Sequence, residues 1–292
     1  MTISEELLQR ATSLLERIEQ LLPDEGSPVD ADNFIAFRWH KRGLSAVLEP
    51  VRYPARIRLD DLYCIDRQVT AIDRNTRQFI NRLPANHVLL WGPRGTGKSS
   101  LIKALLNEYH KEGMRLVEIG NDELGDLPQV IELLRNIPYS FIIYCDDLSF
   151  SAGDSGYKSL KVFVDGSITS TPDNVLIYAT SNRRHLVPEY MEENRQSRNI
   201  DGELHLSEAV EEKISLSERF GLWLAFHPFN QNQYLAIVDH WLKEMQAPVE
   251  DMKTVHEAAL QWALEHGSRS GRSAWQFARD WTGRHKLDEN HD

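Results

Sequence analysis

Residues 87–100 read HVLLWGPRGTGKSS, and this stretch decides the fold. Within it, the run from Gly92 to Ser99 satisfies the phosphate-loop pattern G-x-x-x-x-G-K-[ST]. The pattern requires a strand before it and a helix after it, and both are predicted here, from HVLLW and from residues 98–111. Such a loop turns backbone N–H groups and a helix N-terminus toward phosphate oxygens. The sequence therefore predicts nucleotide binding.

The residue types in the loop suggest how the phosphates are held. Lys98 is predicted to place its charge between the β- and γ-phosphates, and Ser99 to place its hydroxyl on Mg²⁺. The complete set of predicted nucleotide-binding residues in the loop is Gly92, Pro93, Arg94, Gly95, Thr96, Gly97, Lys98, Ser99 and Ser100.

Five short apolar runs organise the middle of the chain. They are HVLLW (87–91), RLVEI (115–119), FIIYC (141–145), VLIYA (175–179) and LWLAF (222–226). Runs that are apolar at consecutive positions are typical of strands buried on both faces, and helical segments separate them. The expected fold is α/β, with a five-stranded parallel sheet and helices on both faces.

Two flanking regions are expected to be helical. Residues 3–22 have the spacing of an amphipathic helix, whereas 24–60 have no assigned function. After Pro228 the segments 230–246, 253–266 and 272–282 look helical. The predicted domains are therefore an N-terminal helix and linker extension at 1–60, a nucleotide-binding core at 61–228 and a small all-α C-terminal unit at 229–292.

Polar side chains follow two of the predicted strands. Asp146 and Asp147 follow FIIYC, and Asn182 follows VLIYA. Open α/β sheets bind their ligands at the carboxyl ends of the strands. Asp146 is predicted to hold Mg²⁺, and Asp147 to orient or deprotonate the attacking water. Asn182 would stand beside Asp147 if the two strands are neighbours.

Composition narrows the class of protein. The chain has 292 residues, a formal charge of −11 and 41% hydrophobic residues, which is ordinary globular composition. No apolar run approaches the roughly 18 residues that span a membrane, so no membrane partner is expected. With two cysteines and no visible secretory signal, we expect a cytoplasmic protein.

The acidic balance of the chain argues against a protein that coats nucleic acid. A basic cluster with interleaved aromatic residues, between Arg38 and Arg58, either binds nucleic acid or neutralises the chain's own acids.

Together these motifs resemble the AAA+ ATPases over roughly residues 61–285. The resemblance implies ATP and Mg²⁺ as cofactors and a helical lid at the C-terminus. DDLYCIDRQ resembles the segment that packs on adenine, which implies a base contact for Ile65. Asn182 matches the sensor 1 position, and SERFGL places Arg219 where the family carries its arginine finger. SGRSAWQF puts Arg272 at the sensor 2 position, with Arg269 one turn away as the alternative.

A narrower resemblance is carried by LPANHVLLWGPRGTGKSS, CDDLSF and SNRRHL, which resemble a bacterial ATP-binding family catalogued only as a domain of unknown function.

Three departures from the AAA+ pattern matter. Asp147 is one methylene shorter than the usual glutamate, which can slow turnover, and Cys64 replaces a common glycine. The loop GNDELGD carries three acids and lacks the aromatic residue with which protein-unfolding members grip a polypeptide. Threading by the usual device is therefore not expected.

Two functions follow from these features. The first is an Mg²⁺-dependent ATPase acting on a macromolecular partner, as a homo-oligomer in which Arg219 of one subunit completes the neighbour's site. The second is a slow ATP-gated switch or loader that recruits a protein or nucleic-acid partner through its N-terminal helix or its insertion. That insertion, residues 188–218, has nine acids and three bases, which suggests a partner-sensing or intersubunit element. A kinase is the weakest alternative, because no acceptor site is visible.

Overall fold

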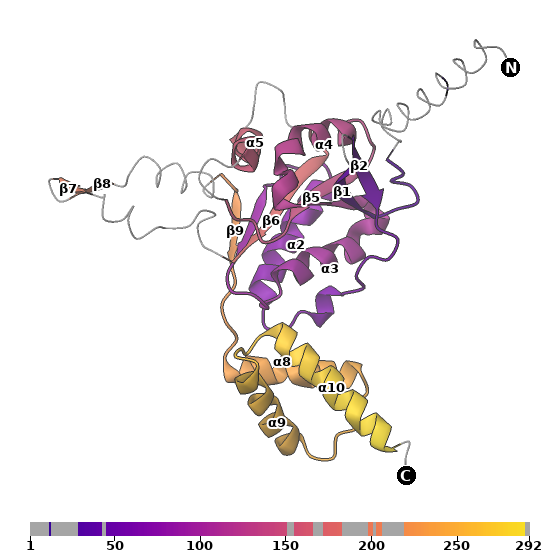
Figure 1. Ribbon diagram of the computed structural model, residues 1–292, viewed down its shortest axis with the longest axis vertical. Helices are drawn as coiled ribbons and strands as arrows, with labels where there is room; N and C mark the ends of the chain where they lie inside the picture. The colour runs from indigo at the N-terminus through magenta and orange to yellow at the C-terminus, as the bar shows by residue number, and fades with distance from the viewer. Residues whose placement is uncertain are drawn as a thin grey trace, which may run out of the picture.

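The computed structural model describes residues 12, 29–42, 45–150, 155–165, 172–182, 198–200, 203–205 and 219–289. The helix expected at 3–22 lies outside these residues except for Thr12, and so does most of the insertion at 188–218. From the insertion, β7 (Arg198–Ile200) and β8 (Glu203–His205) form an antiparallel pair. Figure 1 shows an α/β body with a separate group of helices below it.

The central sheet has seven strands, in the order β2-β1-β4-β5-β6-β3-β9. All five predicted strands are present and parallel: β3 (Val88–Trp91), β4 (Met114–Ile119), β5 (Ser140–Cys145), β6 (Val175–Ser181) and β9 (Leu222–Ala225). The expected count of five was wrong. β1 (Ala36–Arg42) pairs in parallel with β4, and β2 (Ser45–Pro50) pairs antiparallel with β1 at the sheet edge. Both strands come from the segment expected to be helix and linker.

β1 also explains half of the basic cluster. Phe37 and Trp39 are buried and alternate with Arg38 and His40, which therefore lie on the opposite face of the strand. Lys41, near the end of the strand, lies on the same face as Trp39. On that strand Arg38 donates two hydrogen bonds to Glu118, at 2.8 and 3.0 Å. The Lys41 ammonium lies 2.9 Å from the carboxylate of Asp126. These bases neutralise the chain's own acids, as one of the two interpretations of the cluster predicted.

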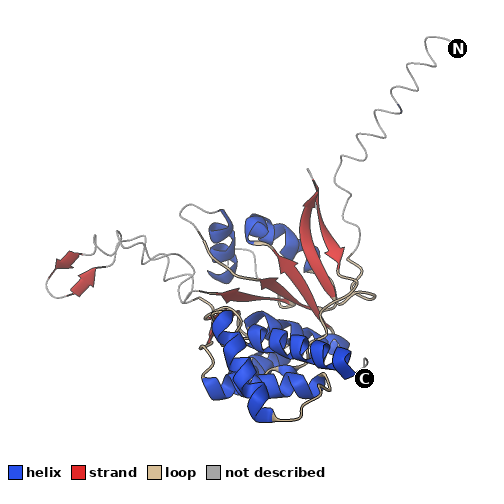
Figure 2. Ribbon diagram, turned by 60° about the horizontal axis from the view of Figure 1, so that its bottom comes forward, coloured by secondary structure: helices blue, strands red, loops and turns tan. Residues whose placement is uncertain are grey.

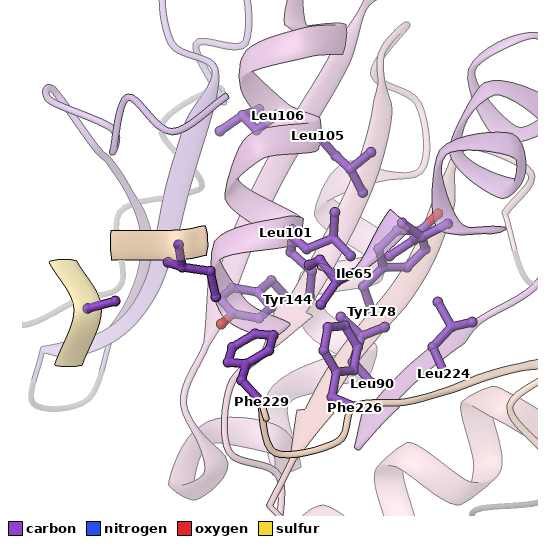
Figure 3. Close-up of a cluster of buried hydrophobic side chains, with 14 of the residues drawn as sticks. Ile65, Leu90, Leu101, Leu105, Leu106, Tyr144, Tyr178, Leu224, Phe226 and Phe229 are labelled. Carbon is purple, nitrogen blue, oxygen red and sulfur yellow. The ribbon is translucent and has the colours of Figure 1, made fainter. Parts of the chain in front are cut away.

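Helices cover both faces of the sheet, and each face has its own apolar cluster. α2 (Asp66–Ile80) and α3 (Lys98–Tyr109) pack on one face, in a cluster that contains Leu90 (Figure 3). α4 (Leu127–Leu134) and α5 (Ser155–Asp165) pack on the other face, in a cluster that contains Leu89. Adjacent residues of β3 thus point into opposite cores, which is why the strand is apolar throughout. The short 3₁₀ helices η1 (Leu59–Asp61), η2 (His110–Glu112) and η3 (Asn121–Asp126) complete this part of the chain.

Three further helices form the C-terminal unit: α8 (Gln231–Glu244), α9 (Met252–Glu265) and α10 (Gly271–Glu289). Asn230 and Asp251 cap the first two through side-chain hydrogen bonds to backbone N–H groups. These helices gather at one end of the sheet (Figure 2). α10 begins directly against the phosphate loop, because the Gly271 N–H donates to the carbonyl of Gly95 at 2.8 Å. No helix in the described ranges is long and apolar enough to cross a membrane.

Candidate nucleotide-binding site

The loop between β3 and α3 has a backbone that requires glycine at two positions. Gly92 has φ 142°, and a Cβ there would lie 2.2 Å from the carbonyl oxygen of Phe226. Gly95 has φ 76°, and its Cβ would lie 2.7 Å from the Cβ of Ser270, just before α10. The loop therefore passes too close to β9 and to the C-terminal unit for any side chain at these positions.

Lys98 lies at the start of α3 and is only 6% exposed. Its ammonium donates to the carbonyls of Gly92 (2.6 Å) and Pro93 (2.8 Å) and to Oδ1 of Asn182 (3.2 Å). Burial lowers the pKa of Lys98 to about 8, although the carboxylates of Asp147 and Asp146 act to raise it. A buried ammonium with three uncharged acceptors is suited to bind an anion.

Asp146 accepts two short hydrogen bonds on one carboxylate oxygen. Ser99 Oγ donates at 2.8 Å and Thr180 Oγ1 at 2.6 Å, both to Oδ1. Desolvation acts to raise the pKa of Asp146, but the hydrogen bonds, that of Thr180 foremost, hold it below its usual value. The side chain is therefore an anionic carboxylate beside a hydroxyl group, which are the oxygen ligands that Mg²⁺ takes in proteins.

Asp147 is held from four directions. Its carboxylate accepts from Nδ2 of Asn182 (2.5 Å) and from Nη2 of Arg94 (2.8 Å). Its backbone N–H donates to Thr180 Oγ1, and its carbonyl accepts from Nδ2 of Asn121. These contacts hold the residue at φ 52°, in the left-handed region that non-glycine residues seldom adopt. The predicted proximity of Asn182 and Asp147 is thus observed, because β5 and β6 are neighbours.

A pocket of about 710 Å³ connects the loop to the C-terminal unit. Its polar and charged lining residues are the loop from Arg94 to Ser100, both aspartates, Thr180, Asn182, Arg56, Asp61 and Arg272. Its apolar and aromatic lining residues are Ala55, Ile57, Leu62, Tyr63, Ile65, Phe229, Ile237, Trp241 and Trp275. Ile65 is buried, and its Cδ1 lies 3.3 Å from where a Cβ on Gly97 would be. A ligand that has both an anionic part and a flat apolar part fits this lining.

The three arginines implied by the AAA+ resemblance lie in different places. Arg272 lines the pocket from the first turn of α10. Arg269 and Arg219 are absent from the pocket lining. Arg269 is exposed, and Arg219 is half-buried just before β9. Of the two alternatives for sensor 2, only Arg272 faces the pocket.

Sequence reasoning missed two polar residues that hold the aspartates. Thr180 binds the side chain of Asp146 and the backbone of Asp147, and Asn121 reaches Asp147 from the start of η3, which follows β4. Thr180 lies two residues before Asn182, so a hydroxyl at the end of a buried strand was the available signal. The position of Asn121 had no such signal, since it depends on how β4 and β5 pair.

The residues present fit Mg²⁺ bound together with phosphates rather than alone. In the described part of the chain there is no group of three or more His, Cys, Asp or Glu side chains that could hold a metal. Asp146 and Ser99 supply two oxygens side by side. A hard cation at this position would take its remaining ligands from phosphate oxygens and water, which is the usual arrangement for Mg²⁺ in nucleotide sites.

Comparison with known proteins agrees with this fold. The model of the family described as "Protein of unknown function (DUF815)" matches residues 32–285. Two solved variants of Thermotoga maritima RuvB, an AAA+ ATPase, superpose with TM-scores of 0.52 and 0.51, both at 14% identity. They cover 76% and 78% of this chain, which spans 63% and 65% of theirs. At this identity the likeness shows a shared fold. No curated protein matches the sequence.

Proposed function

The chain belongs to the family described as Protein of unknown function (DUF815), and from its site we propose that it binds ATP with Mg²⁺ and hydrolyses it to ADP and phosphate. One observation carries the proposal: the buried Lys98 ammonium and the Ser99–Asp146 pair line one pocket together with a set of apolar and aromatic side chains. The polar groups suit a triphosphate, and the apolar side chains suit a purine base that contacts Ile65.

The described contacts support a division of roles among the polar residues. Lys98 binds the phosphates, and Ser99 with Asp146 would hold Mg²⁺, which when bound offsets the charge on the phosphate oxygens. Asp147 orients or deprotonates the attacking water, and Asn182, whose amide binds Asp147, helps to position that water.

We propose that two arginines complete the site. Arg272 lies at the start of α10 in the pocket wall, so it can reach the γ-phosphate and couple a helical lid to the nucleotide. Arg219 lies outside its own pocket, which is consistent with a guanidinium that acts in the site of a neighbouring subunit. The active form is then a homo-oligomer.

Two substitutions test the proposal. Lys98→Ala should abolish ATP binding, because it removes the cation around which the loop is built. Asp147→Asn should bind ATP with near-normal affinity and fail to turn it over, since the amide keeps the shape of the side chain but cannot accept a proton. Calorimetry gives binding and phosphate release gives turnover. Hydrolysis at the wild-type rate by Asp147→Asn would refute the assignment of the water-activating group.

A slow ATP-gated switch or loader is the second candidate, and one observation favours it. Both carboxylate oxygens of Asp147 already accept a hydrogen bond, from Asn182 and from Arg94, so an attacking water has to share the carboxylate with these two donors. A steady-state assay separates the two functions. Turnover of about one per second favours a motor, and turnover of a few per hour favours a switch. The median for enzymes is about 10 per second.

The partner is proposed to be a protein, in a cytoplasmic setting that fits two free cysteines. Nucleic acid has weaker support than the sequence suggested, because Arg38 and Lys41 are occupied by Glu118 and Asp126. Arg52 and Arg56 remain exposed. A DNA titration at several salt concentrations, with Arg52 and Arg56 changed to alanine, tests this partner class.

A further inference from the structure

Asn107 links the phosphate-loop helix to the far wall of the pocket. It lies in the last turn of α3, and its Nδ2 donates to the carbonyl oxygens of Ala55 and Ile57, at 2.7 Å each. At about 1.5 Å per residue, the nine residues from Lys98 to Asn107 span about 14 Å of helix. One rigid element therefore carries the phosphate-binding lysine at one end and the anchor of this wall at the other.

The wall that Asn107 holds has little else to fix it. Residues 55–57 have no regular secondary structure, and all three line the pocket. Among the described residues, their only hydrogen bonds are the two that Asn107 donates. The N–H groups of Ala55, Arg56 and Ile57 and the C=O of Arg56 consequently have no partner within the part of the chain that the structure describes.

We propose that Asn107 is a positioning residue for base selection, which rests on the proposed nucleotide site. It holds residues 55–57 so that their backbone, with the free carbonyl of Arg56 and three free N–H groups, faces the edge of a purine. Adenine presents its N6 amino donor where guanine presents the O6 acceptor. The free carbonyl of Arg56 accepts from the amino group and repels the guanine oxygen. The wall therefore selects adenine over guanine nucleotides.

Three ligands separate this role from general structural damage: ATP, GTP and inorganic tripolyphosphate, each with Mg²⁺. The wild-type chain should bind ATP more tightly than GTP. Asn107→Asp keeps the size of the side chain but presents oxygen to the two carbonyls. It should weaken ATP binding by about tenfold, equivalent to about 1.4 kcal/mol, and reduce the preference for ATP over GTP. Tripolyphosphate, which has no base, should bind within about twofold of wild type.

Asn107→Ala, which removes the donors without adding repulsion, should shift ATP binding in the same direction by a smaller factor. Asn81→Asp is the matched control. Asn81 also donates to a backbone carbonyl at a helix end, that of Arg77, and it does not line the pocket. It should leave all three affinities unchanged.

The possible failures point to different conclusions. A wild-type chain that binds GTP as well as ATP overturns the inference, and so does equal weakening of ATP and tripolyphosphate in both Asn107 variants. Unchanged ATP affinity in Asn107→Asp overturns it too. If the wild type binds neither ATP nor tripolyphosphate, the proposed function itself fails.

Discussion

Raising the pH from 7 to 9.5 should weaken ATP binding, because Lys98 loses its proton in that range. Burial lowers the pKa of this side chain from 10.5 to about 8. The phosphates of ATP favour the ammonium form, so binding raises the pKa again and takes up a proton. Affinity should be nearly flat below pH 8 and then fall by up to about tenfold per pH unit.

Folding stability should respond to the same proton with the opposite sign. The pKa of Lys98 is 10.5 in an unfolded chain and about 8 in the folded protein, and this difference corresponds to about 3 kcal/mol in the free energy of unfolding. Between those values the unfolded chain binds more protons than the folded chain. The contribution of Lys98 therefore makes the nucleotide-free protein more stable as the pH rises from about 8 to about 10.5. Comparison with Lys98→Met isolates this contribution from those of other groups.

Calorimetry in two buffers of different ionisation enthalpy measures the proton directly. With a pKa of about 8, each ATP bound should take up about 0.1 proton at pH 7, about 0.5 at pH 8 and about 0.9 at pH 9. Lys98→Arg, which stays charged throughout, should bind more weakly and show no uptake in this range. Absence of proton uptake at pH 9 by the wild type, with constant affinity, would refute the reasoning.

Three further substitutions test the loop, the sheet edge and the assembly. Gly92→Ala should lower the free energy of unfolding by about 2 kcal/mol or more in urea titrations, and abolish ATP binding, because its Cβ would meet the Phe226 carbonyl. A fold as stable as wild type would mean that the loop can move away from β9. Trp39→Ala should cost about 3–5 kcal/mol in the same titration, since the side chain is fully buried and its Nε1 donates to Asp126. A loss below about 1 kcal/mol would show that β1 contributes little to the core. Arg219→Ala should lower turnover by about 10³-fold with ATP binding retained, measured as phosphate release over a range of protein concentrations. Wild-type turnover that does not depend on concentration would argue against a finger supplied by a neighbour.

The edge strands β1 and β2 were not predicted from the sequence, and the reason is physical. A strand buried on both faces is a continuous apolar run, which is why the five central strands were visible. β1 has one buried face, so Phe37 and Trp39 alternate with Arg38 and His40, and the bases suggested a binding patch. The period-two alternation was the available signal. The burial of this strand depended on pairing with β4, whose partner residues lie 80 positions further along the chain.

Local chemistry determined the centre of this protein. A strand, a glycine-rich turn and a helix carrying Lys98 and Ser99 are contiguous in the sequence, so their spacing alone predicted a phosphate site. The position of the acids after β5 was also predicted, because parallel strands all end at the same edge of the sheet. Packing between distant segments decided which arginine enters the pocket. It also decided what holds the pocket wall at residues 55–57. Arg269 lies before the start of α10 and so is not one helical turn from Arg272, although the sequence suggested that it was, and the hydrogen bond of Gly271 to Gly95 holds the start of α10, with Arg272, against the loop. Asn107 is an ordinary helix residue until tertiary structure brings two carbonyls within 2.7 Å of its amide.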